Sequence, residues 1–246
     1  MIARRRLIVG NWKMSGNHAQ LTELDAIDAT ARAHPDVDIA LCLPFTMIER
    51  AAARRSALSI GAQDCHAGLG GAHTGDISAD MLRESGASWV IVGHSERRTA
   101  YGESDAMVRA KAEAAIEAGL NVLVCVGENA SERRAGEAEQ VVTAQLEQSF
   151  PWNKGARTPA VAYEPVWAIG TELTAATEQV AAMHRAIRKL LDDREVRLVY
   201  GGSVSPANAG DLLVLPEVDG LLVGRASLTA SDFIPIVEAA VRTRVP

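Results

Sequence analysis

Two residues, Glu164 and His94, have the side chains that acid–base catalysis at carbon requires. Glu164 follows a short apolar segment and precedes Pro165, whose ring restricts the backbone of Glu164 to an extended conformation. His94 follows the apolar segment 89–93. Considered alone, each residue also has a non-catalytic explanation. Glu164 can be a solvated residue at a strand end, and His94 can have a structural role. Brought together, a carboxylate and an imidazole can move a proton and polarise a carbonyl group.

The sequence after His94, Ser95-Glu96-Arg97-Arg98, is typical of the first turn of a helix. The N–H groups at a helix N-terminus carry partial positive charge, which disfavours an imidazolium beside them. We therefore expect His94 to be a neutral imidazole that donates a hydrogen bond to a carbonyl of the substrate. This chemistry requires no metal and no cofactor.

Three further segments carry groups suited to an anionic ligand. Asn11 and Lys13 share the side-chain parity of Val9, so an amide and an ammonium face the same side if the strand continues to Lys13. Glycine-containing turns follow two later apolar segments, Tyr200-Gly201-Gly202-Ser203 and Val223-Gly224-Arg225. Such turns present backbone N–H groups, which bind phosphate after the last two strands of many barrels.

The elements that position these residues alternate along the whole chain, apolar strand-like segments with segments of helical periodicity. We expect eight strands, over residues 7–11, 38–43, 58–62, 89–93, 122–126, 160–163, 197–200 and 220–223. The clearest helices cover 19–32, 105–118, 177–191 and 232–242, and Gly119 is a plausible helix stop. Apolar strands separated by helices indicate a parallel sheet covered on both faces.

This pattern predicts an α/β protein, a single (β/α)8 barrel domain over residues 1–246 with about 31 residues per unit. The alternative is a doubly wound open sheet, which usually has a glycine-rich dinucleotide turn after its first strand. Here that turn reads Gly10-Asn11-Trp12-Lys13, which favours the barrel. In a barrel, the C-terminal ends of all strands share one mouth. His94 and Glu164 then meet there, as an acid–base pair requires.

Composition limits the remaining function classes. The chain has 246 residues, 48% hydrophobic and 23% charged, with a formal net charge of −6. A net negative charge argues against a general nucleic-acid or anionic-membrane surface. The apolar residues near the N-terminus are too few for a signal peptide or a membrane span. Three widely spaced cysteines give no disulfide framework, and a cytoplasmic location is therefore expected.

The segment 64–78 is about 15 residues long, which is unusual between a strand and a helix and suggests a binding or oligomerisation role. It contains Cys65, His66 and His73, but no second group of ligands accompanies them, so we expect no metal site. Cys42 and Cys125 fall within apolar strands and are interpreted as core residues.

Four motifs occur together and in order: Gly10-Asn11-Trp12-Lys13-Met14, Gly93-His94-Ser95-Glu96-Arg97-Arg98, Ala162-Tyr163-Glu164-Pro165-Val166-Trp167-Ala168-Ile169-Gly170-Thr171 and Tyr200-Gly201-Gly202-Ser203-Val204. With them the chain resembles the triosephosphate isomerases over essentially its whole length. The resemblance implies a TIM barrel and the interconversion of dihydroxyacetone phosphate and D-glyceraldehyde 3-phosphate through a cis-enediolate, a step of glycolysis and gluconeogenesis.

The resemblance also implies a role for each residue of the mouth. Glu164 would move the proton between two carbons, His94 would polarise the carbonyl, and Lys13 and Asn11 would stabilise the oxyanion and contact the substrate. Glu96 would pair with Lys13, and Ser95 would hold the Glu164 carboxylate while the site is open.

The same resemblance implies a lid over the site and a loop that projects into a second copy of the chain. Residues 166–176 would form a lid, and Tyr200 would steady its closed form. The phosphate would be bound by Gly170, Ser203, Gly224 and the N–H of Arg225. The loop 64–78 would reach into a second copy in a homodimer, where Thr74 would support the partner's Asn11 and Lys13.

The chain departs from the usual family pattern at four positions. Glu172 stands in the lid where the family has glycine, and Arg225 replaces the second glycine after the last strand. Its guanidinium either projects outward, which we favour, or adds a cation near the phosphate. Asp64 stands where asparagine is common, and Ser15 where asparagine often follows methionine; we expect little from these two.

Glu172 and Arg225 motivate one alternative function, an isomerase of a phosphorylated ketose with four carbons. A non-catalytic barrel that binds phosphorylated metabolites is a second alternative. It is disfavoured because Asn11 and Lys13 accompany His94 and Glu164, and none of the four is needed to fill a core.

Overall fold

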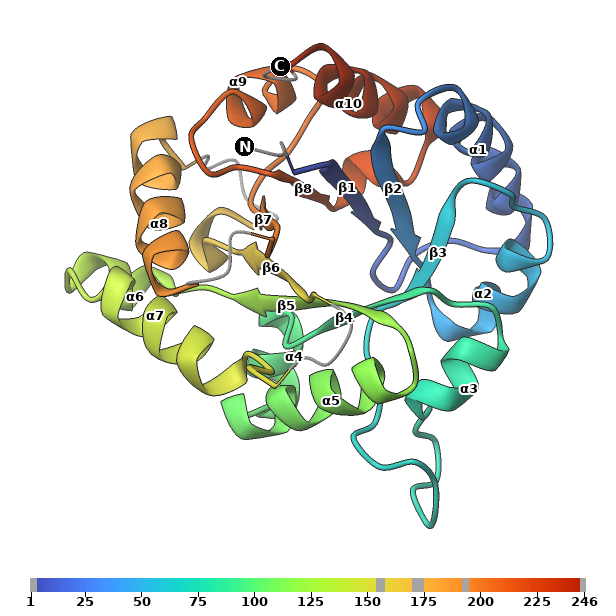
Figure 1. Ribbon diagram of the computed structural model, residues 1–246, viewed down its shortest axis with the longest axis horizontal. Coiled ribbons are helices and arrows are strands. Elements are labelled where there is room, and N and C mark those ends of the chain that lie inside the picture. Colours follow the sequence, from blue (N-terminus) through green and yellow to red (C-terminus); the bar gives the residue numbers. More distant parts are fainter. Residues whose placement is uncertain (1–3, 154–157, 170–174, 192–194, 244–246) are drawn as a thin grey trace.

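Eight parallel strands close into a barrel in which each strand pairs with its neighbours in chain order and β8 returns to β1 (Figure 1). The computed structural model describes residues 4–153, 158–169, 175–191 and 195–243. The strands are β1 (Arg6–Asn11), β2 (Val37–Cys42), β3 (Ser59–Ala62), β4 (Trp89–Val92), β5 (Asn121–Val126), β6 (Ala160–Tyr163), β7 (Leu198–Tyr200) and β8 (Gly220–Val223). The predicted barrel is confirmed, and the strand ends differ from the prediction by one residue at most.

Helices follow the strands and surround the barrel (Figure 1). The predicted helix 19–32 is divided, because a capping box at Asn17 starts a short 3-10 turn before the α-helix. Gly119 has a φ of 84° just after α5, the left-handed conformation of a helix stop. The helices are α1 (Glu23–Ala33), α2 (Phe45–Ala52), α3 (Ala79–Glu84), α4 (Ser95–Tyr101), α5 (Asp105–Glu117), α6 (Ala130–Arg134), α7 (Ala138–Ser149), α8 (Thr177–Leu190), α9 (Ala209–Leu213) and α10 (Ala230–Arg242), with 3-10 turns η1 (His18–Thr22), η2 (Val166–Ala168) and η3 (Arg225–Ser227).

The core has two parts because successive strand residues point to opposite faces of the sheet. The smaller part fills the barrel interior and includes Leu7, Val9, Cys42 and Cys125, all fully or almost fully buried. The larger part lies between the strands and the surrounding helices. The two cysteines are therefore core residues, as predicted, and burial raises the pKa of both thiols. A filled interior confines the open space to the ends of the barrel.

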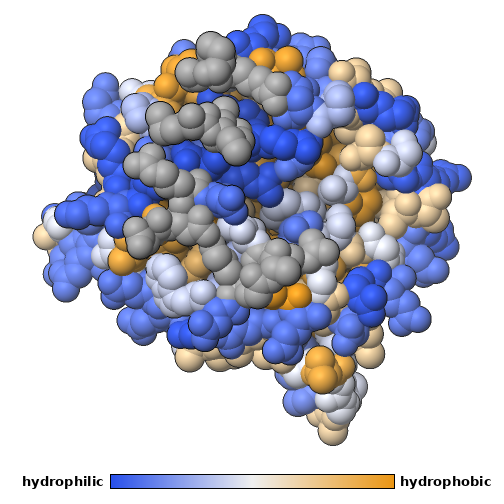
Figure 2. Space-filling model, viewed as in Figure 1, coloured by the Kyte–Doolittle hydropathy of each residue, from blue (hydrophilic) through white to orange (hydrophobic). Residues whose placement is uncertain are grey.

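The long connection between β3 and α3 leaves the barrel and projects beyond the ring of helices (Figure 1). Its base is fixed by one bridge, in which the N–H of His66 donates to the carbonyl of Ile77 at 2.8 Å. The face seen in Figure 2 is mostly hydrophilic, but hydrophobic atoms lie on this projecting loop. Leu69 in the loop is 69% exposed. In the described part of the chain, no helix combines the length and apolar character of a membrane span.

Asp28 connects α1 to the segment before β3. Its Oδ1 accepts hydrogen bonds from the backbone N–H groups of Ser56, Ala57 and Leu58, at 2.9 to 3.1 Å. Burial alone raises the pKa of Asp28, but these N–H groups and Arg32 outweigh it and lower the pKa from 3.8 to about 2. The charged form is thus favoured by folding, a contribution of about 2 kcal/mol that is present above pH 3.8 and lost as the pH falls toward 2.

We expect Asp28→Ala to lower the free energy of unfolding by about 2 kcal/mol at pH 7, because three backbone N–H groups lose their acceptor. Urea titration at pH 7 and at pH 3 measures this, and the difference between wild type and variant should shrink at the lower pH. Asp25→Ala is the matched control, since the Asp25 side chain on the same helix is 69% exposed and its pairing with Arg55 contributes little. An equal effect of both variants would contradict the role of Asp28.

Candidate active site

The C-terminal ends of strands from all parts of the chain surround one cavity of about 910 Å³. Its lining includes the residues that the sequence predicted from β1, β4, β6, β7 and β8, namely Asn11, Lys13, His94, Glu164, Ser203, Gly224 and Arg225. Asn11 and Arg225 are far apart in sequence, and only closure of the barrel brings their strands side by side. The cavity therefore has the position of a barrel active site.

Glu164 is 1% exposed, and its two carboxylate oxygens have different surroundings. Oε2 accepts a hydrogen bond from the backbone N–H of Ser95 at 3.0 Å. Oε1 is buried and has no hydrogen-bond partner among the described residues. A buried carboxylate oxygen without a donor keeps a lone pair available, which is what a base needs to accept a proton from carbon.

Gly127, after β5, is required for this position of Glu164. A Cβ atom at Gly127 would lie 1.8 Å from the carbonyl oxygen of Glu164, so no other residue allows the two segments to approach this closely. The N–H of Glu164 donates to the carbonyl of Val126 at 2.8 Å. The backbone of the candidate base is therefore held against the end of β5.

His94 caps α4 and is 5% exposed. The N–H of Glu96 donates to its Nδ1 at 3.2 Å. A ring nitrogen that accepts a hydrogen bond carries no proton, so the imidazole is neutral and its proton lies on Nε2. Nε2 lies 3.0 Å from Oε1 of Glu164, although the angle is not that of a hydrogen bond. This nitrogen can therefore donate to a bound carbonyl oxygen next to the base.

Lys13 lies beyond the end of β1, which stops at Asn11. The condition under which Val9, Asn11 and Lys13 would share one face is therefore not met, and Lys13 has a left-handed backbone with a φ of 53°. Such a conformation costs a non-glycine residue about 1 to 3 kcal/mol. Two side chains stabilise it: Oδ1 of Asn11 accepts from the N–H of Lys13 at 3.0 Å, and Nε2 of Gln63 donates to its carbonyl at 2.9 Å.

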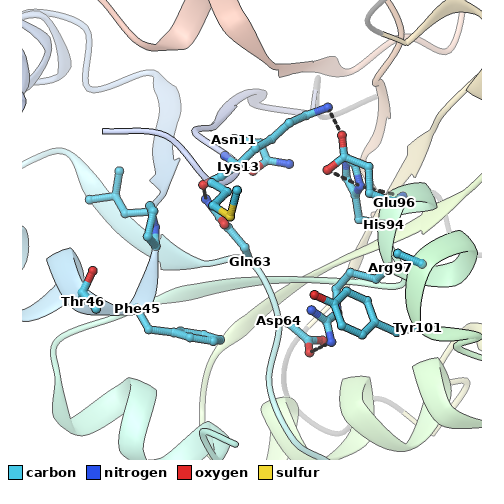
Figure 3. Close-up of a pocket in the computed structure, with 14 residues that line it drawn as sticks. Asn11, Lys13, Phe45, Thr46, Gln63, Asp64, His94, Glu96, Arg97 and Tyr101 are labelled. Atoms are coloured by element: carbon cyan, nitrogen blue, oxygen red, sulfur yellow. Dashed lines mark hydrogen bonds and ion pairs between the residues drawn. The ribbon is translucent and has the colours of Figure 1, made fainter. Parts of the chain in front are cut away.

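The ammonium of Lys13 crosses the mouth to reach Glu96, and their Nζ and Oε1 atoms lie 2.5 Å apart (Figure 3). The pair is partly exposed, with 30% and 55% of the two side chains accessible. Gln63 was not identified from the sequence. Its only signal there was its place directly after the third strand, where a polar side chain enters the mouth.

Tyr200 lies under the segment that follows Glu164. Its hydroxyl is buried without a hydrogen-bond partner among the described residues, and burial with the nearby Glu128 raises its pKa to about 12. Glu128 itself accepts from Tyr163 Oη at 3.2 Å and from Trp167 Nε1 at 2.9 Å. Gly170 and Glu172, two residues of the predicted lid, lie outside the described residues.

Thr74 does not line this cavity; it is exposed on the projecting loop. A second cavity, of about 490 Å³, opens beside the first and shares Asn11, Lys13 and His94 with it (Figure 3). Its outer wall is apolar, with Met14 99% exposed and Tyr101 70% exposed. The second cavity thus leads from Asn11, Lys13 and His94 to an exposed apolar surface.

Asp64, a position from which little effect was expected, belongs to a buried network at the base of this second cavity. Its carboxylate lies 2.8 Å from Nζ of Lys111 and 2.8 Å from Nη2 of Arg97, and both cations also contact Glu103. Burial raises the pKa of Asp64 despite Lys111. The carboxylate of Asp64 therefore lies between two cations, which it shares with Glu103.

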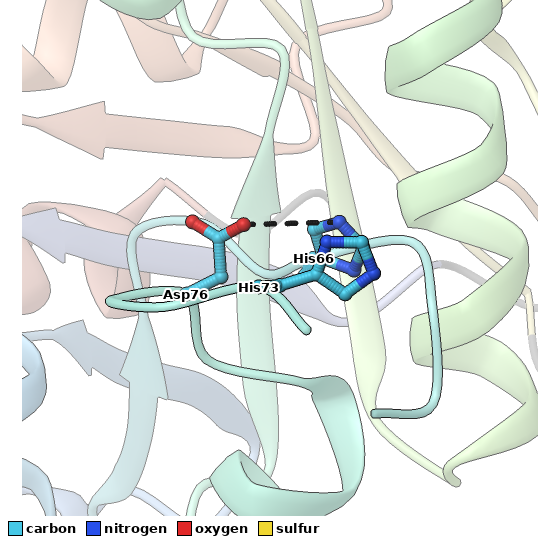
Figure 4. Close-up of side chains that lie close together, drawn as sticks. All are labelled: His66, His73 and Asp76. Atoms are coloured by element: carbon cyan, nitrogen blue, oxygen red, sulfur yellow. Dashed lines mark ion pairs between the residues drawn. The ribbon is translucent and has the colours of Figure 1, made fainter. Parts of the chain in front are cut away.

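The projecting loop brings His66 and His73 together with Asp76, a residue that the sequence analysis had not associated with them (Figure 4). Their potential ligand atoms lie within 4.8 Å of one another. However, Nδ1 of His66 accepts from the N–H of Gly68 at 2.8 Å, so the neutral ring carries its proton on Nε2, the atom that faces Asp76. The nitrogen that a cation would need has no free lone pair, and this geometry disfavours a metal site.

Comparisons with known proteins agree over nearly the whole chain. A sequence model of the triosephosphate isomerase family matches residues 6–240. Triosephosphate isomerase of Afipia carboxidovorans is 54% identical over 244 residues, which cover 96% of this chain and 97% of that protein. The enzyme of Ruegeria pomeroyi is 52% identical over 245 residues, covering 96% and 97%. A crystal structure of triosephosphate isomerase from Bartonella henselae is 44% identical and has a TM-score of 0.87, covering 96% of this chain and 98% of that chain.

Proposed function

The chain belongs to the triosephosphate isomerase family, and from this premise we propose which of its side chains carry out the reaction. It is an isomerase that interconverts dihydroxyacetone phosphate and D-glyceraldehyde 3-phosphate. The observation that carries the assignment is the buried Oε1 of Glu164, which lacks a hydrogen-bond donor and lies 3.0 Å from Nε2 of His94. Base and electrophile therefore face the same point of the cavity.

The reaction starts when Oε1 of Glu164 removes a proton from the carbon next to the carbonyl group. The electron pair of the C–H bond forms the carbon–carbon double bond, and the carbonyl oxygen becomes an enediolate oxygen. Nε2–H of His94 and the ammonium of Lys13 stabilise this charge, with the amide of Asn11 beside them. Glu164 then returns the proton to the neighbouring carbon, while His94 moves hydroxyl protons between the two oxygens. No atom is gained or lost.

The phosphate site is proposed on the opposite side of the cavity, at the turns after β7 and β8. Ser203 and Gly224 line this side, and the N–H of Arg225 follows. Residues 166–176 are proposed as a lid, with the N–H of Gly170 as a further phosphate donor. A closed lid excludes water, which protects an enediolate that can otherwise eliminate phosphate. The buried, unpartnered hydroxyl of Tyr200 is suited to steady the closed segment.

Turnover of purified wild type tests this function directly. We expect rapid isomerisation of glyceraldehyde 3-phosphate in a coupled assay, and little or none of a four-carbon phosphorylated ketose. Preference for the four-carbon substrate would support the alternative function that Glu172 and Arg225 suggested. Phosphate binding without turnover of either substrate would instead support a non-catalytic barrel.

We also propose that two copies associate through the loop 64–78. The loop of one copy would enter the second cavity of the other, whose rim carries exposed Met14, Phe45 and Tyr101. Leu69 on the loop is apolar and exposed, as an interface residue of a separated subunit would be. Because this cavity includes Asn11 and Lys13, Thr74 of the partner would reach the back of the active site.

Sedimentation of wild type is therefore expected to give twice the chain mass of 26.1 kDa. Thr74→Arg should shift the protein toward monomer and lower kcat, because a long charged side chain cannot enter a cavity that fits threonine. Val214→Arg is the control, since Val214 is also exposed but lies after α9, on the outside of the barrel. A wild type that sediments as one chain with full activity would contradict the dimer.

A cytoplasmic location is part of the same proposal. It is supported by three cysteines that are all buried and form no disulfide.

A further inference from the structure

Arg225 has no functional assignment for its side chain, since only its backbone N–H enters the phosphate site. It begins η3, directly after Gly224, and its side chain is exposed at the rim of the active-site cavity. The φ of Arg225 lies outside the left-handed region, so the backbone at this position does not require the glycine that the family usually has. The arginine therefore fits this backbone without strain.

The charges that line the cavity are unevenly compensated. Lys13 and Arg225 are the two cationic residues among the described lining residues. Lys13 is paired with Glu96 at 2.5 Å, whereas the guanidinium of Arg225 has no hydrogen-bond or ion-pair partner in the described part of the chain. The carboxylates in the same lining, Glu164 and Asp232, accept hydrogen bonds from Ser95 and Thr229 and form no ion pair with Arg225. Among the described lining residues, Arg225 is therefore the cation whose side chain is not held by a carboxylate.

A cation whose side chain is unpaired matters here because the ligand is a dianion and the whole chain carries a net charge of −6. A protein of net negative charge slows the approach of a phosphate ester unless the mouth has a local positive potential. Gly224 lies close to Lys13. A Cβ atom added to Gly224 would be 3.9 Å from Cε of that lysine. The rim cation thus stands next to the side of the cavity where the phosphate is proposed to bind.

We propose that the guanidinium of Arg225 is a second determinant of phosphate recognition, which attracts the dianionic phosphate ester to the mouth and holds it through long-range charge rather than through direct catalysis. The inference rests on the proposed function for the identity of the ligand. The side chain is exposed where it lines the cavity, and it acts on the phosphate because a unit charge at the rim is not fully screened over about 10 Å.

The test compares Arg225→Gln and Arg225→Gly with wild type at ionic strengths of about 10 mM and 300 mM. We expect both variants to raise KM for glyceraldehyde 3-phosphate, and Kd for inorganic phosphate measured by calorimetry, by roughly threefold at low salt. The effect should vanish at high salt, and kcat should change less than the two binding constants. Arg225→Lys should recover most of the loss, because it keeps the charge.

Arg242→Gln is the matched control, with the same change in net charge at a side chain that is 66% exposed at the end of α10. It should leave both constants unchanged. The proposal is overturned if Arg225→Gln equals wild type in phosphate Kd at low salt, or if its loss is the same at both ionic strengths. If wild type failed to isomerise the triose phosphate, the proposed function would fail, while the phosphate Kd values would still decide the role of Arg225.

Discussion

We expect Glu164→Gln to lower kcat by roughly 10³- to 10⁴-fold and to change KM by only a few fold. The amide keeps the size of the side chain, and its oxygen can still accept from the N–H of Ser95. It has no basic oxygen for the carbon-bound proton, however, so the chemical step loses its base. Glu164→Asp, which keeps the carboxylate but withdraws it by one methylene, should lose about 10²-fold in kcat.

The control for Glu164→Gln is Glu139→Gln, the same chemical change at an exposed position of α7. It should retain the activity of wild type. Circular dichroism and urea titration of both variants separate a catalytic loss from a folding defect. If Glu164→Gln kept more than a tenth of the wild-type kcat, another group would have to be the base.

Lys13→Met is expected to lower kcat/KM by roughly 10²- to 10³-fold, because the variant removes the ammonium that faces the developing enediolate charge. Methionine has a similar length, and Asn11 and Gln63 still hold the backbone at this position. Stability should change little, since the lost ion pair with Glu96 is partly exposed. Steady-state kinetics and the urea midpoint measure the two effects separately.

Lys189→Met is the matched control, since Lys189 is exposed on α8. The kcat/KM of Lys13→Arg should lie between the values for Lys189→Met and Lys13→Met, because arginine keeps the charge but not the position of the donor. Equal kcat/KM in Lys13→Met and Lys189→Met would remove Lys13 from the mechanism.

The barrel was predictable because strand and helix signals repeat along the whole chain, and closure follows from the repeat. The chemistry at the strand ends was predictable for the same reason. His94 and Glu164 each follow an apolar segment, and a closed parallel barrel places both at one mouth. The helix start after His94 also predicted a neutral imidazole. In the structure, the backbone N–H of Glu96 in the first turn of that helix donates to Nδ1 of His94.

The support of these residues was not predictable from spacing. The left-handed backbone of Lys13 depends on Asn11 and on Gln63, which is fifty positions away in sequence. The contacts of Asp64 were also not predictable, because nothing in the neighbouring sequence indicates that Lys111 and Arg97 approach its carboxylate. Contacts of this kind arise between side chains of different loops, where neither periodicity nor motif carries information.

The central claim is that a carboxylate transfers a proton between adjacent carbons through an enediolate. Isomerisation of dihydroxyacetone phosphate by wild type in deuterated water, followed by proton NMR of the product, tests it most directly. A proton held by Glu164 can exchange with solvent, so glyceraldehyde 3-phosphate should carry deuterium at C2. Isomerisation with no deuterium at C2, together with an unchanged kcat in Glu164→Gln, would indicate direct hydrogen transfer between the carbons and would contradict the role of Glu164 as the base.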